Sequence, residues 1–192
     1  MSPVTARRPL RADARRNYDR LLDAAREAVA QHGAEASLDD IARRAGVGSG
    51  TLYRHFPTRA ALLEAVFHEQ IDGLCAQAAA HLEDPDPAAA LRAWLEAVLL
   101  HSIRNRGMAA ALRTEHTDST WCYATMQESA GRLLTRAQVV GALRADVPVS
   151  DLLRLINGLA LANLDAPDAE QSAVRMLGYA LAGMRAGVAP AR

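Results

Sequence analysis

Apolar residues recur every three or four positions along most of the chain, which is the spacing of an amphipathic helix. No stretch of useful length alternates apolar and polar residues with a period of two, so we expect no strands. All eight prolines lie at predicted helix boundaries or in the tails. The pattern therefore predicts an all-α fold with about nine helices. Their approximate bounds are residues 13–32, 37–45, 50–56, 58–82, 88–105, 108–113, 119–143, 151–163 and 168–185.

Residues 37–59, with the sequence SLDDIARRAGVGSGTLYRHFPTR, predict two short helices joined by a tight turn. Ser37 is a favourable N-cap for the first helix, because its hydroxyl can accept a hydrogen bond from a backbone N–H group. The glycines of Gly46-Val47-Gly48 supply turn conformations that other residues resist. Pro57 ends the second helix, since proline disfavours helical geometry in the residue before it. The arrangement is that of a helix-turn-helix motif.

The second of these helices, about residues 50–56, has only about two turns and would be marginal on its own. It displays a dense row of hydroxyls, an imidazole and a guanidinium, which are groups that suit phosphate oxygens and base edges. Arg54 is the predicted base reader, because arginine pairs bidentately with guanine. The alternative is a surface hairpin in which Tyr53 and Phe56 are ordinary core aromatics. Phe56 is predicted to be a core residue under either interpretation.

The segment GVGSGTLYRHFPTRAALL closely resembles the recognition segment of the tetracycline-repressor (TetR) family. The resemblance is sharp over about residues 15–65, and the remainder is similar to that family in helix count and order only. Residues 1–12 contain prolines and arginines with little to pack, which predicts a flexible basic tail. The resemblance implies a three-helix, helix-turn-helix DNA-binding domain at 13–57 and a helical ligand-binding and dimerisation domain at 58–192. For the tail, the alternative is an arm that reaches phosphates or a minor groove.

The resemblance implies a sequence-specific transcriptional regulator, most often a repressor that a small molecule releases from a palindromic operator in double-stranded DNA. By resemblance, Tyr53 and His55 should contact phosphates. Ser37 suits a phosphate because it lies at a helix N-terminus, and Arg59 stands where the family commonly has lysine. Gly48 departs from the family pattern, in which a polar side chain is frequent. The predicted DNA-binding residues are Ser37, Ser49, Gly50, Thr51, Tyr53, Arg54, His55 and Arg59.

The resemblance also implies a ligand cavity among the helices of residues 88–143. Arg104 could be an anchor for the ligand or simply exposed. His101 could likewise be an anchor or exposed, and for each candidate the alternative is that the residue is part of the core. We expect a small, largely apolar ligand. The residues best able to line an apolar pocket with a few polar anchors are Trp94, His101, Met108, Trp121, Tyr123 and Met126.

The last two predicted helices are candidates for a homodimer interface. A helix-turn-helix protein usually needs two-fold pairing to bind two half-sites. Members of the family that this chain resembles pair through their last two helices, as a four-helix bundle. The alternative is that both helices belong to the core of a monomer. The predicted interface residues are Leu155, Ile156, Leu159, Val174, Leu177, Leu181 and Met184.

The 192-residue chain has a formal net charge of zero, which at first argues against a nucleic-acid partner. The distribution of charge answers that objection, because residues 1–60 carry eleven arginines against seven acidic residues. A basic head on an acidic body is typical of a DNA-reading module joined to a separate partner domain. Lysine is absent from the chain, so every cationic contact to DNA must use a guanidinium group.

Other functional classes find little support in the sequence. Cys75 and Cys122 make no disulfide framework, and we expect them to be small core residues in a reducing cytosol. The chain has no nucleophile-elbow, phosphate-loop or dinucleotide-binding motif. We therefore expect no metal, no cofactor and no enzymatic activity. The histidines that could suggest a metal site, but lack the spacing of metal ligands, are His68, His81, His101 and His116.

The N-terminus lacks the apolar segment of a signal peptide, and no apolar run approaches the length that a membrane span requires. We therefore expect a soluble cytoplasmic protein with no membrane partner. Two alternatives stay open. One is a helical enzyme or carrier with a vestigial DNA-binding head, and the other is an activator or a regulator that responds to no ligand.

Overall fold

The computed structural model describes the backbone of residues 7–105 and 120–187, and most of the side chains from residue 13 onward. Within these ranges the chain forms eight α-helices and one short 3-10 helix, with no strand. The predicted all-α fold class is confirmed. The short helix predicted at residues 108–113 lies outside the described residues. No helix in the described part of the chain is long and apolar enough to cross a membrane.

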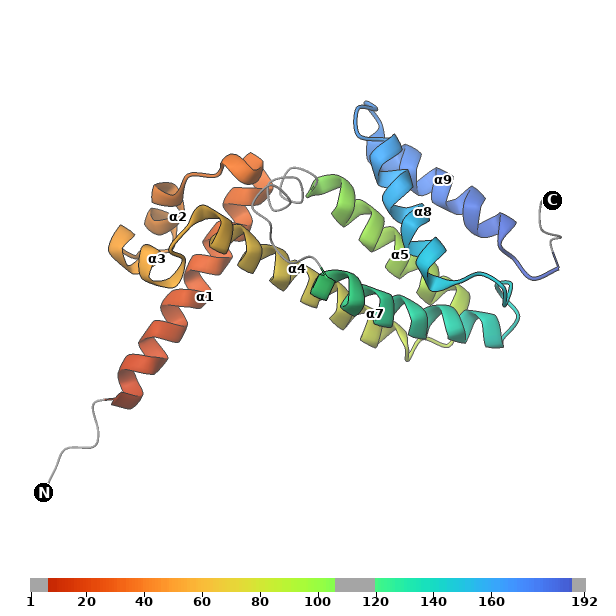
Figure 1. The fold of residues 1–192 in the computed structure, drawn as a ribbon, viewed down its shortest axis with the longest axis horizontal. Coiled ribbons are helices and arrows are strands. Elements are labelled where there is room, and N and C mark those ends of the chain that lie inside the picture. The colour runs from red at the N-terminus through yellow and green to blue at the C-terminus, as the bar shows by residue number, and fades with distance from the viewer. Residues whose placement is uncertain (1–6, 106–119, 188–192) are drawn as a thin grey trace, which may run out of the picture. The chain divides into compact units, whose positions relative to one another are not determined.

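The helices follow one another in the order shown in Figure 1. The bounds are α1 Arg7–His32, η1 Gly33–Glu35, α2 Leu38–Arg44, α3 Ser49–His55, α4 Arg59–His81, α5 Pro87–Arg104, α7 Thr120–Val139, α8 Val149–Ala162 and α9 Ala169–Gly183.

Some predicted helix ends differ from the structure by two to six residues. Helix α1 begins at Arg7, so the second half of the predicted tail is helical. Pro9 is compatible with this start, because the first four N–H groups of a helix have no partner within the helix. Helix α8 begins at Val149, two residues before the predicted start at residue 151. Helix α7 ends at Val139, and Gly141 follows with a φ of 71°, a conformation that favours glycine.

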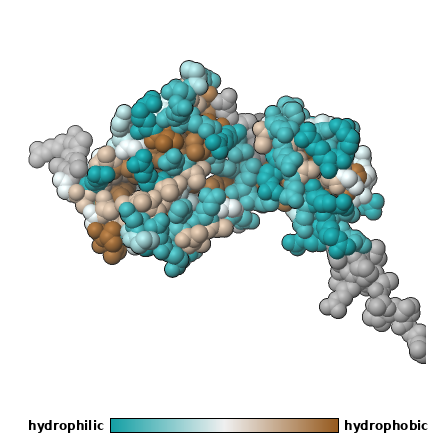
Figure 2. All heavy atoms as spheres, turned by 180° about the vertical axis from the view of Figure 1, so that it is seen from behind, coloured by the Kyte–Doolittle hydropathy of each residue, from teal (hydrophilic) through white to brown (hydrophobic). Residues whose placement is uncertain are grey.

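The chain divides into two compact units, and the division falls within α4, between Glu69 and Gln70. The N-terminal unit has its own apolar core, built from α1, α2, α3 and the start of α4. Representative core residues are Leu21, Ile41, Leu52, Phe56 and Leu62. On the face shown in Figure 2 the surface of this unit is almost entirely hydrophilic, whereas hydrophobic patches lie on the C-terminal unit.

The turn between α2 and α3 is closed by backbone hydrogen bonds at the end of α2. The N–H of Gly46 donates to the carbonyl of Arg43 (3.1 Å), and that of Val47 donates to the carbonyl of Ala42 (3.0 Å). This pair of bonds is the Schellman motif, which needs a left-handed residue after the C-cap. Gly46 supplies that residue, with a φ of 65°. The turn predicted from the glycines is therefore formed in a defined conformation.

Helix α5 is the centre of the C-terminal unit, where it packs against α7, α8 and α9. Its side chains Leu91, Trp94, Leu95 and Leu99 are fully buried. The helix starts at a favourable cap, because the carboxylate of Asp86 accepts hydrogen bonds from the next two free N–H groups at 3.0 Å. The apolar residues of α5 lie on more than one face, which is typical of a helix that packs centrally.

Candidate nucleic-acid interface

Helix α3 has one buried face and one exposed face. Leu52 and Phe56 are four residues apart and almost completely buried, with exposed fractions of 1% and 3%. The other residues of α3 are exposed or half-buried, so the core covers only part of the helix surface. Of the predicted DNA-binding residues on α3, Ser49, Gly50, Tyr53 and Arg54 are exposed, and Thr51 and His55 are half-buried.

The C-terminal end of α3 is held against α1 by aromatic rings. The ring of Tyr18 on α1 lies 5.2 Å from that of Phe56 and 5.8 Å from that of His55, centroid to centroid. Contacts of this kind stabilise beyond the apolar area that they bury. His55 therefore packs against α1 with one side of its ring, in addition to any contact that it makes with DNA. Phe56 is a core residue, as the sequence predicted.

Arg54 projects from the exposed face of α3. Its Nε donates a hydrogen bond to the backbone carbonyl of Gly50, at 3.2 Å. None of the ion pairs among the described residues involves Arg54, so its charge is not neutralised by a neighbouring carboxylate. Tyr53 lies beside it with 48% of its surface exposed. These two residues give α3 a hydroxyl and a full positive charge at the surface.

The first turns of α2 and α4 carry the other predicted DNA contacts. Ser37 is the N-cap of α2, and its Oγ accepts a hydrogen bond from the N–H of Asp40 at 3.4 Å, so the predicted cap is confirmed. Asp40 is itself paired with Arg43 and Arg44, which reduces the negative charge near Ser37. Arg59 is the exposed first residue of α4.

The predicted ligand-binding residues are dispersed between core and surface. Trp94 has no exposed surface, and its Nε1 donates to the backbone carbonyl of Leu74 at 2.8 Å. Met126 is 7% exposed, whereas Tyr123, three residues earlier on α7, is 45% exposed. Met108 and the side chain of Trp121 lie outside the described residues. A groove in the C-terminal unit lies elsewhere, where the end of α4 meets α7, and is lined by Leu82, Gln127, Glu128, Gly131, Arg132, Thr135 and Arg136.

Two polar candidates of the C-terminal unit have local partners. Arg104 forms a bidentate ion pair with Glu170 on α9, with both bonds at 2.7 Å. Hydrogen bonding from Arg104 lowers the pKa of Glu170 below its usual value. His101 is half-buried, with its Nδ1 3.0 Å from the side-chain nitrogen of Asn105. Burial lowers the pKa of His101 to about 4, so its ring is neutral at neutral pH.

The predicted dimer residues also divide between core and surface. Ile156, Leu159 and Leu177 are buried within the chain itself, with at most 7% of each exposed. The predicted interface residues Leu155, Val174, Leu181 and Met184 are half-buried. Sequence reasoning missed the most exposed apolar side chains of α8 and α9, which are Leu161 (69%), Met176 (37%) and Tyr179 (69%). The sequence did contain a signal for them, because these apolar residues do not belong to the apolar stripe of either helix that faces the core.

Comparison with known proteins matches both units of the chain. A family model of bacterial regulatory proteins, tetR family, matches residues 21–66. A second model, for the C-terminal domain of SbtR-like transcriptional regulators, matches residues 86–186, which is more than half of the chain. The chain belongs to the TetR family. It is a DNA-binding transcriptional regulator of the helix-turn-helix type, and the resemblance noted in its recognition segment is confirmed.

Relatives of this TetR-family regulator cover most of its length. The solved structure of the TetR regulator SCO0520 from Streptomyces coelicolor is 35% identical, covers 88% of this chain and 98% of that chain, and has a TM-score of 0.74. A TetR regulatory protein from Mycobacterium vanbaalenii is 33% identical, with coverages of 92% and 99% and a TM-score of 0.70. The regulator UidR from Escherichia coli is 26% identical over 188 residues, which is 85% of this chain and 89% of UidR.

The family and its relatives are regulators rather than enzymes. In the part of the TetR-family chain that the structure describes, no three metal-binding side chains gather into a potential site. The two cysteines are unpaired thiols, each half-buried. Burial, with a smaller effect of Cys75, raises the pKa of Cys122 to about 11, so this thiol is protonated at neutral pH.

The half-buried His101 predicts a pH-dependent stability. Its pKa is about 4 in the folded state and about 6.5 when unfolded, so only the unfolded state gains a proton between these values. The free energy of unfolding should therefore fall by about 1–3 kcal/mol as the pH falls from about 6.5 to about 4. In denaturant titrations His101→Gln should lose this part of the pH dependence, with His81→Gln as the matched control. Equal pH dependence in the wild type and in His101→Gln would contradict the assignment.

Proposed function

We propose that this TetR-family regulator is a repressor that binds a palindromic operator as a homodimer and is released by a small molecule. The two copies of α3 would enter major grooves about one helical turn of DNA apart, roughly 34–36 Å. The observation that carries the proposal is the exposed polar face of α3, opposite the buried Leu52 and Phe56. As a regulator of genes it would work in the cytoplasm, where it meets its operator.

Arg54 is the proposed base reader. Its Nε is held by the carbonyl of Gly50, which leaves the terminal nitrogens to donate to the O6 and N7 acceptors of guanine. The other residues of the interface are proposed to position the protein through phosphates and sugars, which carry no sequence information directly. These residues are Ser37, Ser49, Gly50, Thr51, Tyr53, His55 and Arg59.

Replacing Arg54 separates base reading from positioning. Arg54→Ala should cost about 1–3 kcal/mol at the base that it reads and relax specificity there. Tyr53→Phe removes only a hydroxyl and should weaken binding to all sequences more evenly. The measurement is a gel shift of DNA fragments from upstream of its own gene, followed by selection of preferred sites and titration over a range of salt concentrations.

The matched control for this experiment is Arg132→Ala, which removes an exposed arginine from α7 in the C-terminal unit. For the wild type, affinity should fall steeply with salt, through release of counterions from the DNA. A wild type without sequence preference or salt dependence would refute the proposed function. A preferred operator that is unchanged in Arg54→Ala would refute only the choice of base reader.

We propose that the protomers pair through α8 and α9. The support is a set of apolar side chains that the single chain leaves exposed on these helices, namely Leu161, Met176 and Tyr179. Large exposed apolar side chains that gather on one surface are typical of an interaction site. The buried Ile156, Leu159 and Leu177 would support this surface from beneath. Half-buried Leu155, Val174, Leu181 and Met184 would contribute the edges of the same interface.

A charge on this surface should separate the protomers without unfolding them. Leu161→Glu and Tyr179→Glu replace exposed side chains, so each folded protomer should tolerate them. In a dimer, however, the new carboxylate would be buried unpaired, which is costly. Light scattering should show monomers, and operator binding should weaken. The control Val139→Glu changes an apolar residue at the end of α7 that is 80% exposed, and should remain dimeric. A dimeric Tyr179→Glu would contradict this interface.

The proposed ligand is small and largely apolar, and would bind among the helices of residues 88–143. Met126, Tyr123 and the rings of Trp94 and His101 are the candidate contacts of the described chain, with Met108 and Trp121 as further candidates. Because the indole N–H of Trp94 is already used by Leu74, this residue could offer only its apolar ring. Helix α4 is continuous and has residues in both units, so it is the proposed route of control.

Control by a ligand requires that the ligand bind the conformation that does not dock on DNA better than the one that does. Coupling of this kind is typically about 1–3 kcal/mol, and operator DNA must weaken the ligand equally. The test is to find compounds that raise the melting temperature and to measure operator affinity with each compound at saturation. Undiminished DNA binding with several such compounds would indicate a regulator that responds to no ligand. Increased transcription on DNA binding would indicate an activator.

A further inference from the structure

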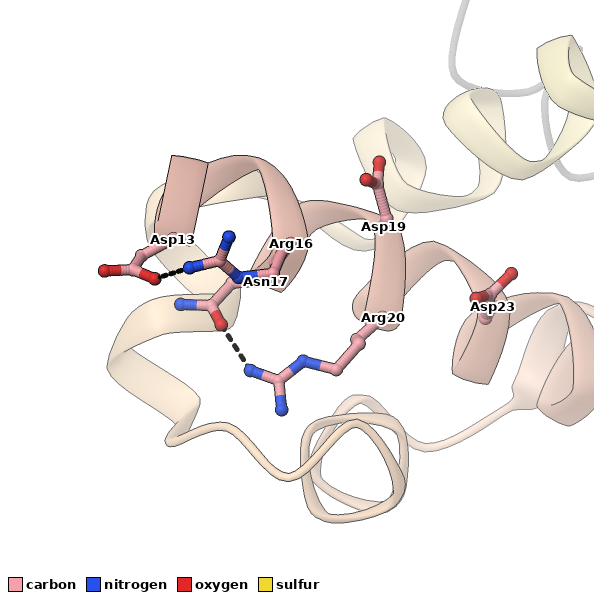
Figure 3. Close-up of a pocket in the computed structure, with 6 residues that line it drawn as sticks. All are labelled: Asp13, Arg16, Asn17, Asp19, Arg20 and Asp23. Atoms are coloured by element: carbon pink, nitrogen blue, oxygen red, sulfur yellow. Dashed lines mark hydrogen bonds and ion pairs between the residues drawn. The ribbon is translucent and has the colours of Figure 1, made fainter. Parts of the chain in front are cut away.

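A groove on the surface of the N-terminal unit runs along α1 and is drawn in Figure 3. Asp13, Arg16, Asn17 and Arg20 follow a spacing of three, four and seven residues, so they share one face of the helix. Figure 3 shows the Arg20 guanidinium beside Asn17 and turned away from Asp19 and Asp23. The groove thus contains both carboxylates and guanidinium groups, and the charge that it presents depends on which of these groups form ion pairs.

Each carboxylate of this groove is matched by an arginine other than Arg20. Asp19 pairs with Arg15 at 3.3 Å. Asp13 is paired with Arg16 and Asp23 with Arg26. Arg20 takes part in none of the ion pairs among the described residues, and its hydrogen-bond partner is the neutral side-chain oxygen of Asn17. Arg20 is therefore the surplus positive charge of the groove.

The guanidinium of Arg20 lies at the turn between α2 and α3. A Cβ atom placed on Gly46 would be 3.8 Å from Nη1 of Arg20. The chain continues from Gly46 through Val47 to Gly48, the N-cap of α3. A positive charge from α1 is thus held next to the segment that leads into the recognition helix.

Arg20 could instead have a structural role, as a hydrogen-bond donor to the free carbonyls at the C-terminal end of α2. The hydrogen bonds of the turn give this alternative little support. The carbonyls of Ile41, Ala42 and Arg43 already accept bonds from the N–H groups of the turn. Arg20 is exposed, and a guanidinium has five N–H donors, of which Asn17 receives one. The remaining donors form a planar fork that suits the oxygens of a phosphate.

We propose that Arg20 is a further contact to the DNA backbone, to a phosphate beside the turn that precedes α3, and that Asn17 orients its guanidinium. The inference rests on the proposed function, because it assumes that α3 docks on DNA. It adds a residue of α1 to an interface otherwise made by α2, α3 and the start of α4. A phosphate contact of this kind positions the protein and does not select a base.

The test is the salt dependence of operator binding by full-length variants. Arg20→Gln should lower the slope of log affinity against log salt by about 0.9 for each DNA-binding head, or about 1.8 for a dimer. Affinity should fall equally for operator and for random DNA, and the melting temperature should not change. Arg20→Lys keeps the charge and should keep most of the slope. The matched control is Arg15→Gln on the same helix, whose guanidinium is paired with Asp19 and 81% exposed.

Each of the following results would contradict the proposed contact between Arg20 and a DNA phosphate. An unchanged slope in Arg20→Gln, with normal wild-type binding, refutes Arg20 alone and leaves the proposed function intact. An equal loss of slope in Arg15→Gln would mean that only the net charge of the head matters. A fall in melting temperature together with the loss of slope would assign Arg20 to the structure of the turn. A wild type that does not bind DNA refutes the proposed function and this contact together.

Discussion

The proposed DNA-reading surface depends on the burial of one side of a seven-residue helix. Helix α3 is too short to be stable in isolation, because nucleating a helix is costly and few hydrogen bonds repay it. Leu52 and Phe56 hold it in the core, and the ring of Tyr18 fixes its end against α1. The same burial leaves the opposite face exposed with a defined orientation. The same packing arrangement therefore stabilises the N-terminal unit and exposes Tyr53 and Arg54.

Pairing of charges divides the described arginines of the N-terminal unit into two groups. The sequence has a neutral net charge and a basic N-terminal part, but most of the guanidinium groups that the structure describes on α1 and α2 are paired with carboxylates three or four residues away. Such exposed pairs contribute little to stability. They do, however, leave an uneven distribution of charge, in which Arg54 and Arg20 stand out as guanidinium groups outside the ion pairs of the described chain.

In the C-terminal unit, the apolar side chains of α8 and α9 are divided between the core and the surface. Helix α5 is buried by α7, α8 and α9, and the apolar stripes of α8 and α9 are largely used in that packing. Leu161 and Tyr179 remain exposed because they lie on the other sides of those helices. The indole of Trp94 joins the same core and uses its N–H on the carbonyl of Leu74. A side chain whose chemistry suits a ligand can therefore already be packed and hydrogen-bonded within the protein itself.

Local features were within reach of the sequence alone. The all-α class, the central α5, the cap Ser37 and the turn at Gly46 follow from periodicity, capping and backbone preference, which act over a few residues. Only the tertiary structure determined which neighbouring element packs on each apolar stripe. Periodicity identifies an apolar face without naming the neighbour that covers it, so Ile156 and Leu177 could not be assigned between core and interface. The proposed role of Arg20 could not be predicted from the sequence for the same reason, because its position beside Gly46 comes from packing of α1 against the turn, 26 residues later in the chain.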